Sequence, residues 1–145
     1  MGMVVSLVYR NTGARSGTVD NVKLKCGRLG SDEIADLYPA YYVDSSQNYQ
    51  FAGLPTPEVI RGGDQLTRTI LFLSDKDWIK HHDFEVGEYK CSALASLNGE
   101  NDPREFRDSD ISFLIRKEDL VPLKATPSQG RIIFTHRMGV TAPIF

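Results

Sequence analysis

The stretch Tyr9–Cys26, YRNTGARSGTVDNVKLKC, joins an apolar run to a two-residue alternation through a polar connection. Asparagine, serine and glycine fill this connection, and Asn and Gly tolerate the positive φ angles of turns. Beyond it, Val22, Leu24 and Cys26 share one face of the alternating run, while polar residues share the other. Such a pattern predicts a strand with one face on a core and one in water. Together with the apolar run Val4–Tyr9, it predicts strand, irregular connection, strand.

Strand-like segments continue at short intervals along the chain. They are Ala40–Val43, Tyr49–Phe51, Val59–Ile60, Leu66–Leu73, Tyr89–Leu97, Ile111–Arg116 and Arg131–His136. Helix signals are confined to Ser31–Leu37 and to Ser74–Lys80, where Ser74 is a candidate cap. About seven or eight short strands with polar turns predict an all-β sandwich. A barrel remains an alternative, because local signals do not determine closure of a sheet.

The composition describes an ordinary globular chain. Its 145 residues favour one domain, and 41% are hydrophobic and 25% charged. The 17 basic and 19 acidic residues give a formal net charge of -2, which disfavours nucleic acid as a partner. No apolar run approaches the ~20 residues of a membrane-spanning helix. We expect a sandwich domain over residues 1–116 and a C-terminal extension over residues 117–145, either an added strand or a docking tail.

A tyrosine stands two residues before the second of the two cysteines, in Tyr89-Lys90-Cys91. This spacing resembles that of immunoglobulin-type sandwiches, in which the tyrosine forms a tyrosine corner and the cysteine bonds across the core to the second strand. The resemblance implies a tyrosine corner at Tyr89 and a disulfide between Cys26 and Cys91. Two buried free thiols are the alternative, because cysteine is among the most buried residue types.

Further short motifs extend the resemblance. They are Asn11-Thr12-Gly13, the strand Thr18–Leu24, the segment Pro57–Gly63, the strand Leu66–Leu73 and Gly87-Glu88-Tyr89. Together they look like the Greek-key, immunoglobulin-like sandwich modules of bacterial surface and membrane-anchored proteins, including the bacterial cell-adhesion-related domain group. The resemblance covers roughly residues 4–116. It implies a non-catalytic, exported module without a cofactor, attached to a membrane only through an anchor outside this chain. A cytoplasmic location is the alternative, since the N-terminus lacks the features of a signal peptide.

Aromatic side chains are most concentrated between residues 38 and 51. Tyr38, Tyr41, Tyr42 and Tyr49 are the candidate binding residues, with Phe51 beside them. Exposed aromatic rings can stack on a sugar or a peptide, whereas the competing interpretation places alternate rings in the core. If Tyr41 and Tyr42 lie in a strand, their rings must face opposite ways.

Catalytic and metal-binding patterns are weak. His81-His82-Asp83 is the only place where imidazoles adjoin a carboxylate, and adjacent residues of an extended chain point opposite ways. The acidic segments Asp75–Asp77 and Asn98–Asp102 lack the spacing of a calcium loop and are interpreted as surface turns. We therefore rank three hypotheses: a protein-binding or self-associating module, then a carbohydrate-binding sandwich using Tyr38–Phe51, then an enzyme.

Overall fold

The computed structural model describes residues 2–47, 50–74, 85–105, 110–117 and 133–143. These residues contain ten strands and one short 3-10 turn, η1 (Ser45–Gln47). The strands are β1 (Gly2–Arg10), β2 (Gly17–Arg28), β3 (Ile34–Asp44), β4 (Gln50–Gly53), β5 (Glu58–Ile60), β6 (Gln65–Ser74), β7 (Gly87–Leu97), β8 (Arg104–Glu105), β9 (Ile111–Ile115) and β10 (Ile133–Pro143).

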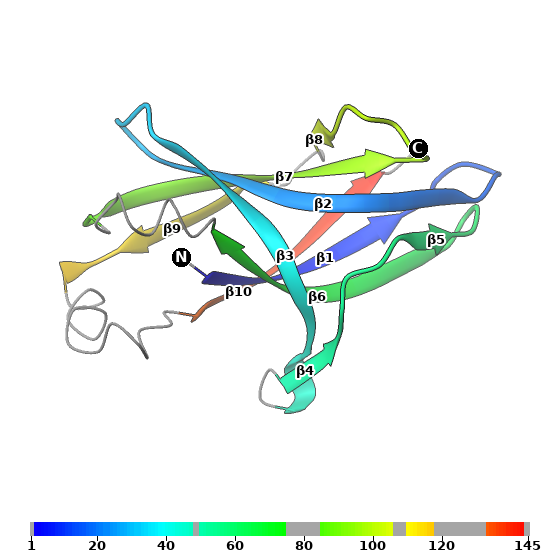
Figure 1. Ribbon diagram of the computed structural model, residues 1–145, viewed down its shortest axis with the longest axis horizontal. Coiled ribbons are helices and arrows are strands. Elements are labelled where there is room, and N and C mark those ends of the chain that lie inside the picture. Colours follow the sequence, from blue (N-terminus) through cyan, green and yellow to red (C-terminus); the bar gives the residue numbers. More distant parts are fainter. Residues whose placement is uncertain (1, 48–49, 75–84, 106–109, 118–132, 144–145) are drawn as a thin grey trace.

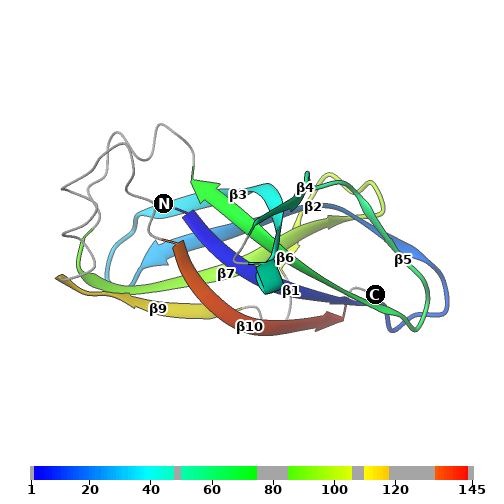
Figure 2. The same ribbon diagram turned by 90° about the horizontal axis from the view of Figure 1, so that it is seen from below.

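All ten strands belong to one sheet that curls into a half-barrel. Its order is β10-β1-β6-β3-β2-β7-β8, with β4 paired to β3, β5 to β2 and β9 to β7. Neighbours are antiparallel except β1 and β10, which run parallel. β2 and β7 run side by side, and β3 crosses from them towards β6 and β1 (Figure 1). From below, β1 lies between β10 and β6 (Figure 2). The prediction of an all-β chain is confirmed.

The main core lies on the inner face of the curl. Leu24 and Cys26 are inward residues of β2, and they belong to the same buried cluster as Val5 of β1 and Phe72 of β6. Side chains of these three strands can meet only on the concave face. Val22, Leu24 and Cys26 therefore face the core, as their alternation with polar residues predicted. A smaller cluster of Val4, Val43 and Leu71 lies on the opposite face, in the other phase of the same strands.

Asn11 explains why the apolar run ends at Arg10. Its side chain is fully buried. Its amide nitrogen donates to the carbonyl oxygens of Ile60 at 3.0 Å and Arg15 at 2.7 Å, and its side-chain oxygen accepts from the Gly13 N–H at 2.9 Å. Its backbone N–H donates to Asp64 and its carbonyl accepts from Gly63. Asn11 therefore joins the β1–β2 connection to the β5–β6 turn.

The helix expected over Ser31–Leu37 is wrong. β3 begins at Ile34 and pairs with β2, placing Ala35 opposite Cys26 and Leu37 opposite Leu24. Both residues are buried in the main core, so long-range burial outweighs the local helix signal. The helix expected over Ser74–Lys80 lies outside the described residues, apart from Ser74 at the end of β6.

The C-terminal extension contributes a strand to the sheet. β10 pairs with β1 from Gly2 opposite Ile133 to Arg10 opposite Pro143, with one irregularity. The strand expected over Arg131–His136 is present from Ile133, where the described residues of this segment begin, and it runs on to Pro143. The two-residue strand β8 has too few residues to show an alternating pattern, so it was not predicted.

Candidate functional site

The sheet has an opening between β2 and β3. β2 pairs with β5 over Gly17–Val19 and with β3 over Leu24–Gly27, and among the described strands none pairs with Asp20–Lys23 on that side. β3 turns towards β6 at Leu37 and pairs with it as far as Tyr42. Two hollows reach the opening, and Asn21, Val22 and Pro39 line both. Their other lining residues belong to opposite faces of the sheet, so the opening has an inner and an outer side.

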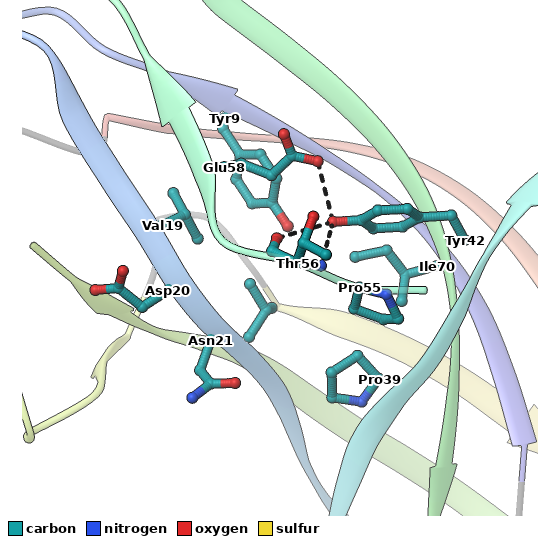
Figure 3. Close-up of a pocket in the computed structure, with 11 residues that line it drawn as sticks. Tyr9, Val19, Asp20, Asn21, Pro39, Tyr42, Pro55, Thr56, Glu58 and Ile70 are labelled. Atoms are coloured by element: carbon teal, nitrogen blue, oxygen red, sulfur yellow. Dashed lines mark hydrogen bonds between the residues drawn. The ribbon is translucent and has the colours of Figure 1, made fainter. Parts of the chain in front are cut away.

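The inner side is filled by a polar cluster (Figure 3). The Tyr42 hydroxyl donates to Glu58 Oε1 at 3.0 Å and accepts from the Thr56 N–H at 3.4 Å. Arg68 donates two hydrogen bonds to the same carboxylate, from Nε to Oε1 at 2.6 Å and from Nη2 to Oε2 at 3.2 Å. The Arg68 guanidinium also lies 5.4 Å from the centre of the Tyr42 ring. These contacts link β3, β5 and β6 where no backbone pairing joins β5 to β6.

Burial and nearby charge raise the pKa values of the tyrosines in this cluster. The pKa of Tyr9 lies well above its usual value, chiefly because the residue is buried and then because Tyr42 and Glu58 are close. Burial also raises the pKa of Tyr42, and the hydrogen bond that its hydroxyl donates to Glu58 adds to the effect. The pKa of Arg68 is raised by its bond to Glu58. The hollow here has a volume of only about 40 Å³, enough for water but not for an organic ligand. The inner cluster therefore holds β3, β5 and β6 together through side chains.

The outer side is a larger groove, which we call the Tyr38 groove. Its volume is about 260 Å³. The lining residues are Asn21, Val22, Lys23, Tyr38, Pro39, Leu94, Ser96, Asn101 and Pro103. They come from β2, β3, β7 and the loop after β7. The groove thus combines one aromatic ring and apolar rims with amide, hydroxyl and ammonium groups.

An ion pair lies beside the Tyr38 ring. Lys23 Nζ is 2.7 Å from Asp36 Oδ2, and both side chains are about one-third exposed, at 30% and 32%. The hydrogen bond to Asp36 raises the pKa of Lys23, and proximity to Tyr38 contributes further. Lys23 therefore stays protonated while its charge is balanced by Asp36.

A bulge in β3 determines on which face of the sheet each of the predicted aromatic residues lies. The pairing with β6 shifts between Pro39 and Tyr41, so Tyr38 and Tyr41 both lie on the outer face, whereas Tyr42 packs against the inner core. Tyr41 contacts the ring of Phe51 with centroids 5.6 Å apart. The opposite orientations of Tyr41 and Tyr42 agree with the sequence argument, and the four aromatic residues that the structure describes do not all lie on one face of the sheet. Tyr49 lies outside the described residues.

Cys26 and Cys91 form a disulfide, and both are almost fully buried. They face each other on the paired strands β2 and β7, so the bond lies within the sheet and does not bridge two sheets across the core. The Tyr89 hydroxyl donates to the carbonyl of Glu85, four residues upstream, at 3.2 Å. That bond is typical of a tyrosine corner. The Tyr89 ring stacks on Phe113, with centroids 5.3 Å apart.

The other segments that the sequence suggested for catalysis or metal binding are described only in part. His81-His82-Asp83 and Asp75–Asp77 fall outside the described residues. In the described part of the chain, no group of three or more His, Cys, Asp or Glu side chains is placed to hold a metal ion. Asn98, in the loop Asn98–Asp102, accepts the N–H of Thr18 through its side chain, as expected of a surface turn. None of the helical structure described is long and apolar enough to span a membrane.

Sequence reasoning missed Glu58 and Arg68 in the inner cluster. A signal for Arg68 was present, because it lies in phase with the inward residues Ile70 and Phe72. A charged residue in the inward phase of a buried strand requires a partner. The sequence holds no comparable signal for Asn21, Ser96 and Asn101, which the fold brings together from separate segments.

Comparison with known proteins assigns the chain to no family. No protein-family model matches it, and no curated protein matches its sequence.

Proposed function

We propose that the protein is a non-catalytic binding module that contacts another protein chain through the ribbon formed by β4, the following linker and β5, residues 50–60. The observation that carries this proposal is the exposure of three large apolar side chains along the ribbon. Phe51, Leu54 and Val59 are 64%, 68% and 67% exposed. Exposed apolar surface of this kind is typical of sites that bury it against a partner.

The ribbon also offers backbone groups for association. Among the described strands, β4 pairs only with β3 and β5 pairs only with β2. Each therefore presents one edge without a strand partner, and such edges accept a strand from another chain. A second copy of this chain is the simplest partner, because two identical edges can pair antiparallel about a twofold axis.

Export is part of the same proposal. The buried Cys26–Cys91 disulfide supports an oxidising compartment, where such bonds form and persist. The location is accordingly proposed as extracytoplasmic, with attachment to a membrane only through a segment outside this chain.

The proposed class is an immunoglobulin-like Greek-key module of bacterial surface proteins. The tyrosine-corner bond between Tyr89 and Glu85 supports it. The bond between Cys26 and Cys91 differs from the usual inter-sheet bridge, since β2 and β7 are neighbours in one curled sheet. The class therefore depends on the short motifs and the tyrosine corner, while the disulfide is a departure from it.

The mass of the purified protein in solution, measured by light scattering after size exclusion, tests the association. We expect a concentration-dependent dimer for the wild type and a monomer for the double variant Phe51→Ser, Leu54→Ser. Tyr38→Ser is the matched control, because it removes an exposed aromatic side chain that lies outside the ribbon.

If the wild type is monomeric, the same variants are compared for retention of proteins from an extract of the native host. Equal retention by the wild type and the ribbon variant would contradict the proposal. Loss of association in Tyr38→Ser would move the contact away from the ribbon.

A further inference from the structure

We propose that the Tyr38 groove is a second, independent binding site and that it takes one neutral pyranose ring of a glycan. The groove lies on the outer face of β2, β3 and β7, and neither Phe51, Leu54 nor Val59 lines it. Its function therefore does not depend on the contact proposed for the ribbon. Four features of the groove lead to this ligand.

The first feature is the exposed ring of Tyr38. The residue is 50% exposed and lines the groove. One face of a pyranose ring presents mainly C–H groups, which pack on the face of an aromatic ring. Tyrosine suits this role because it offers a broad apolar face with a polar hydroxyl at its end. Pro39 and Pro103 extend the apolar surface on either side.

The second feature is a set of uncommitted polar side chains. Asn21, Ser96 and Asn101 line the groove, and within the described part of the chain none of their side chains makes a hydrogen bond. Each amide carries both donors and an acceptor, and a hydroxyl can act as either. Sugar hydroxyls also donate and accept at the same atom, so such groups are suitable partners for them.

The third feature is local charge balance. Lys23 is the charged side chain that lines the groove, and its ammonium group is bonded to Asp36. An anionic sugar would have to compete with this carboxylate for the ammonium group. A neutral sugar can instead place hydroxyls against either member of the pair, which makes it the better match.

The fourth feature is size and shape. A volume of about 260 Å³ accommodates a single sugar ring and is smaller than most drug-sized sites. An added peptide strand is less suitable, although Val22 provides backbone groups at the opening. Pro39 faces them from β3 and has no N–H to donate, so a peptide could not be paired along both sides.

Binding to an array of immobilised oligosaccharides tests the proposal, with neutral chains built from glucose, mannose, galactose or N-acetylglucosamine and acidic chains containing sialic or uronic acids. The wild type should retain at least one neutral chain. Tyr38→Ala should weaken this binding about tenfold or more, the loss expected for one stacking contact. Asn101→Ala should weaken it less, and Phe51→Ala should leave it unchanged.

Thermal melting of each variant shows whether it is folded, and both Tyr38 and Asn101 are exposed enough for truncation to leave the fold intact. Absence of any neutral ligand would overturn the proposal, as would binding restricted to acidic chains. Equal binding by the wild type and folded Tyr38→Ala would also overturn it. If the wild type captured an extended peptide and Tyr38→Ala did not, the groove would belong to a different class of partner, and the proposal of a sugar ligand would be refuted.

Discussion

Cys26 lies directly opposite Cys91 on the neighbouring strand, with their Cα atoms 4.0 Å apart. The short separation is that of a pair whose backbone groups are not bonded to each other, so the backbone groups of Cys26 point towards β3. β2 can therefore pair with β3 on one side while the disulfide ties it to β7 on the other. The bond strengthens the strand pair beside the opening in the sheet.

Removing the disulfide should destabilise the protein substantially. The bridge spans a sequence separation of 65 residues, and the chain-entropy estimate for a loop of that size is about 4 kcal/mol. We expect the double variant Cys26→Ala, Cys91→Ala to lose roughly this free energy of unfolding, measured by urea titration. A thiol assay on denatured, unreduced wild type should detect no free thiol. Two free thiols, or a double variant as stable as the wild type, would be incompatible with the bond.

Loss of the Asn11 side chain should destabilise the protein substantially. Its amide satisfies two backbone carbonyls and one N–H in a site with no exposure, and buried groups left without partners cost about 1–3 kcal/mol each. We expect Asn11→Ala to lower the free energy of unfolding by about 3 kcal/mol or more. The matched control is Asn21→Ala, which truncates an exposed asparagine and should change stability by less than about 0.5 kcal/mol. Similar values for the two variants would refute the bridging role of Asn11.

The sequence predicted most strands because each depends on a local alternation, and the inward phase of Leu24 and Cys26 was visible in that pattern. It did not predict how the strands assemble, since the crossing of β3 from β2 to β6 is set by long-range pairing. The bulge between Pro39 and Tyr41 reverses the phase of the strand, so counting residues could not place Tyr38 and Tyr41 on one face. The burial of Asn11 was missed for a related reason, because its partner carbonyl belongs to Ile60, 49 residues away.

Two adjacent glycines should respond differently to alanine. A Cβ atom at Gly62 would lie 2.5 Å from the backbone carbonyl carbon and oxygen of Ala14, which cannot move without displacing the connection that Asn11 holds. Gly63 has a φ of 81° but no atom close to the added group. We expect Gly62→Ala to cost at least about 2 kcal/mol and Gly63→Ala about 1 kcal/mol, the usual cost of a left-handed conformation. Urea titration measures both. The reverse order would show that the β1–β2 connection is loosely packed against this turn.

Stability should decline at alkaline pH because buried tyrosines resist ionisation. Burial is the main cause that raises the pKa of Tyr9, Tyr42 and Tyr89 in the folded protein above the ordinary value of 10.0. The folded state then holds protons that the unfolded state releases, so the free energy of unfolding is fully present below about pH 10 and falls as the pH rises beyond it. Lys23 and Lys90 also have raised pKa values from their aspartate partners, but solvent reaches both pairs and screens them, so they contribute little.

Urea titrations from about pH 8 to about pH 11 measure this decline. Tyr9→Phe should make it shallower, because Tyr9 is the most buried of the three and cannot ionise as phenylalanine. Its stability at neutral pH can also fall, since the hydroxyl is lost, but only the pH dependence reports on ionisation. Tyr38→Phe, which removes a hydroxyl from a half-exposed ring, should leave the decline unchanged. An identical alkaline decline in wild type and Tyr9→Phe would mean that Tyr9 ionises as easily folded as unfolded, which its place beside Glu58 in the closed inner cluster does not allow.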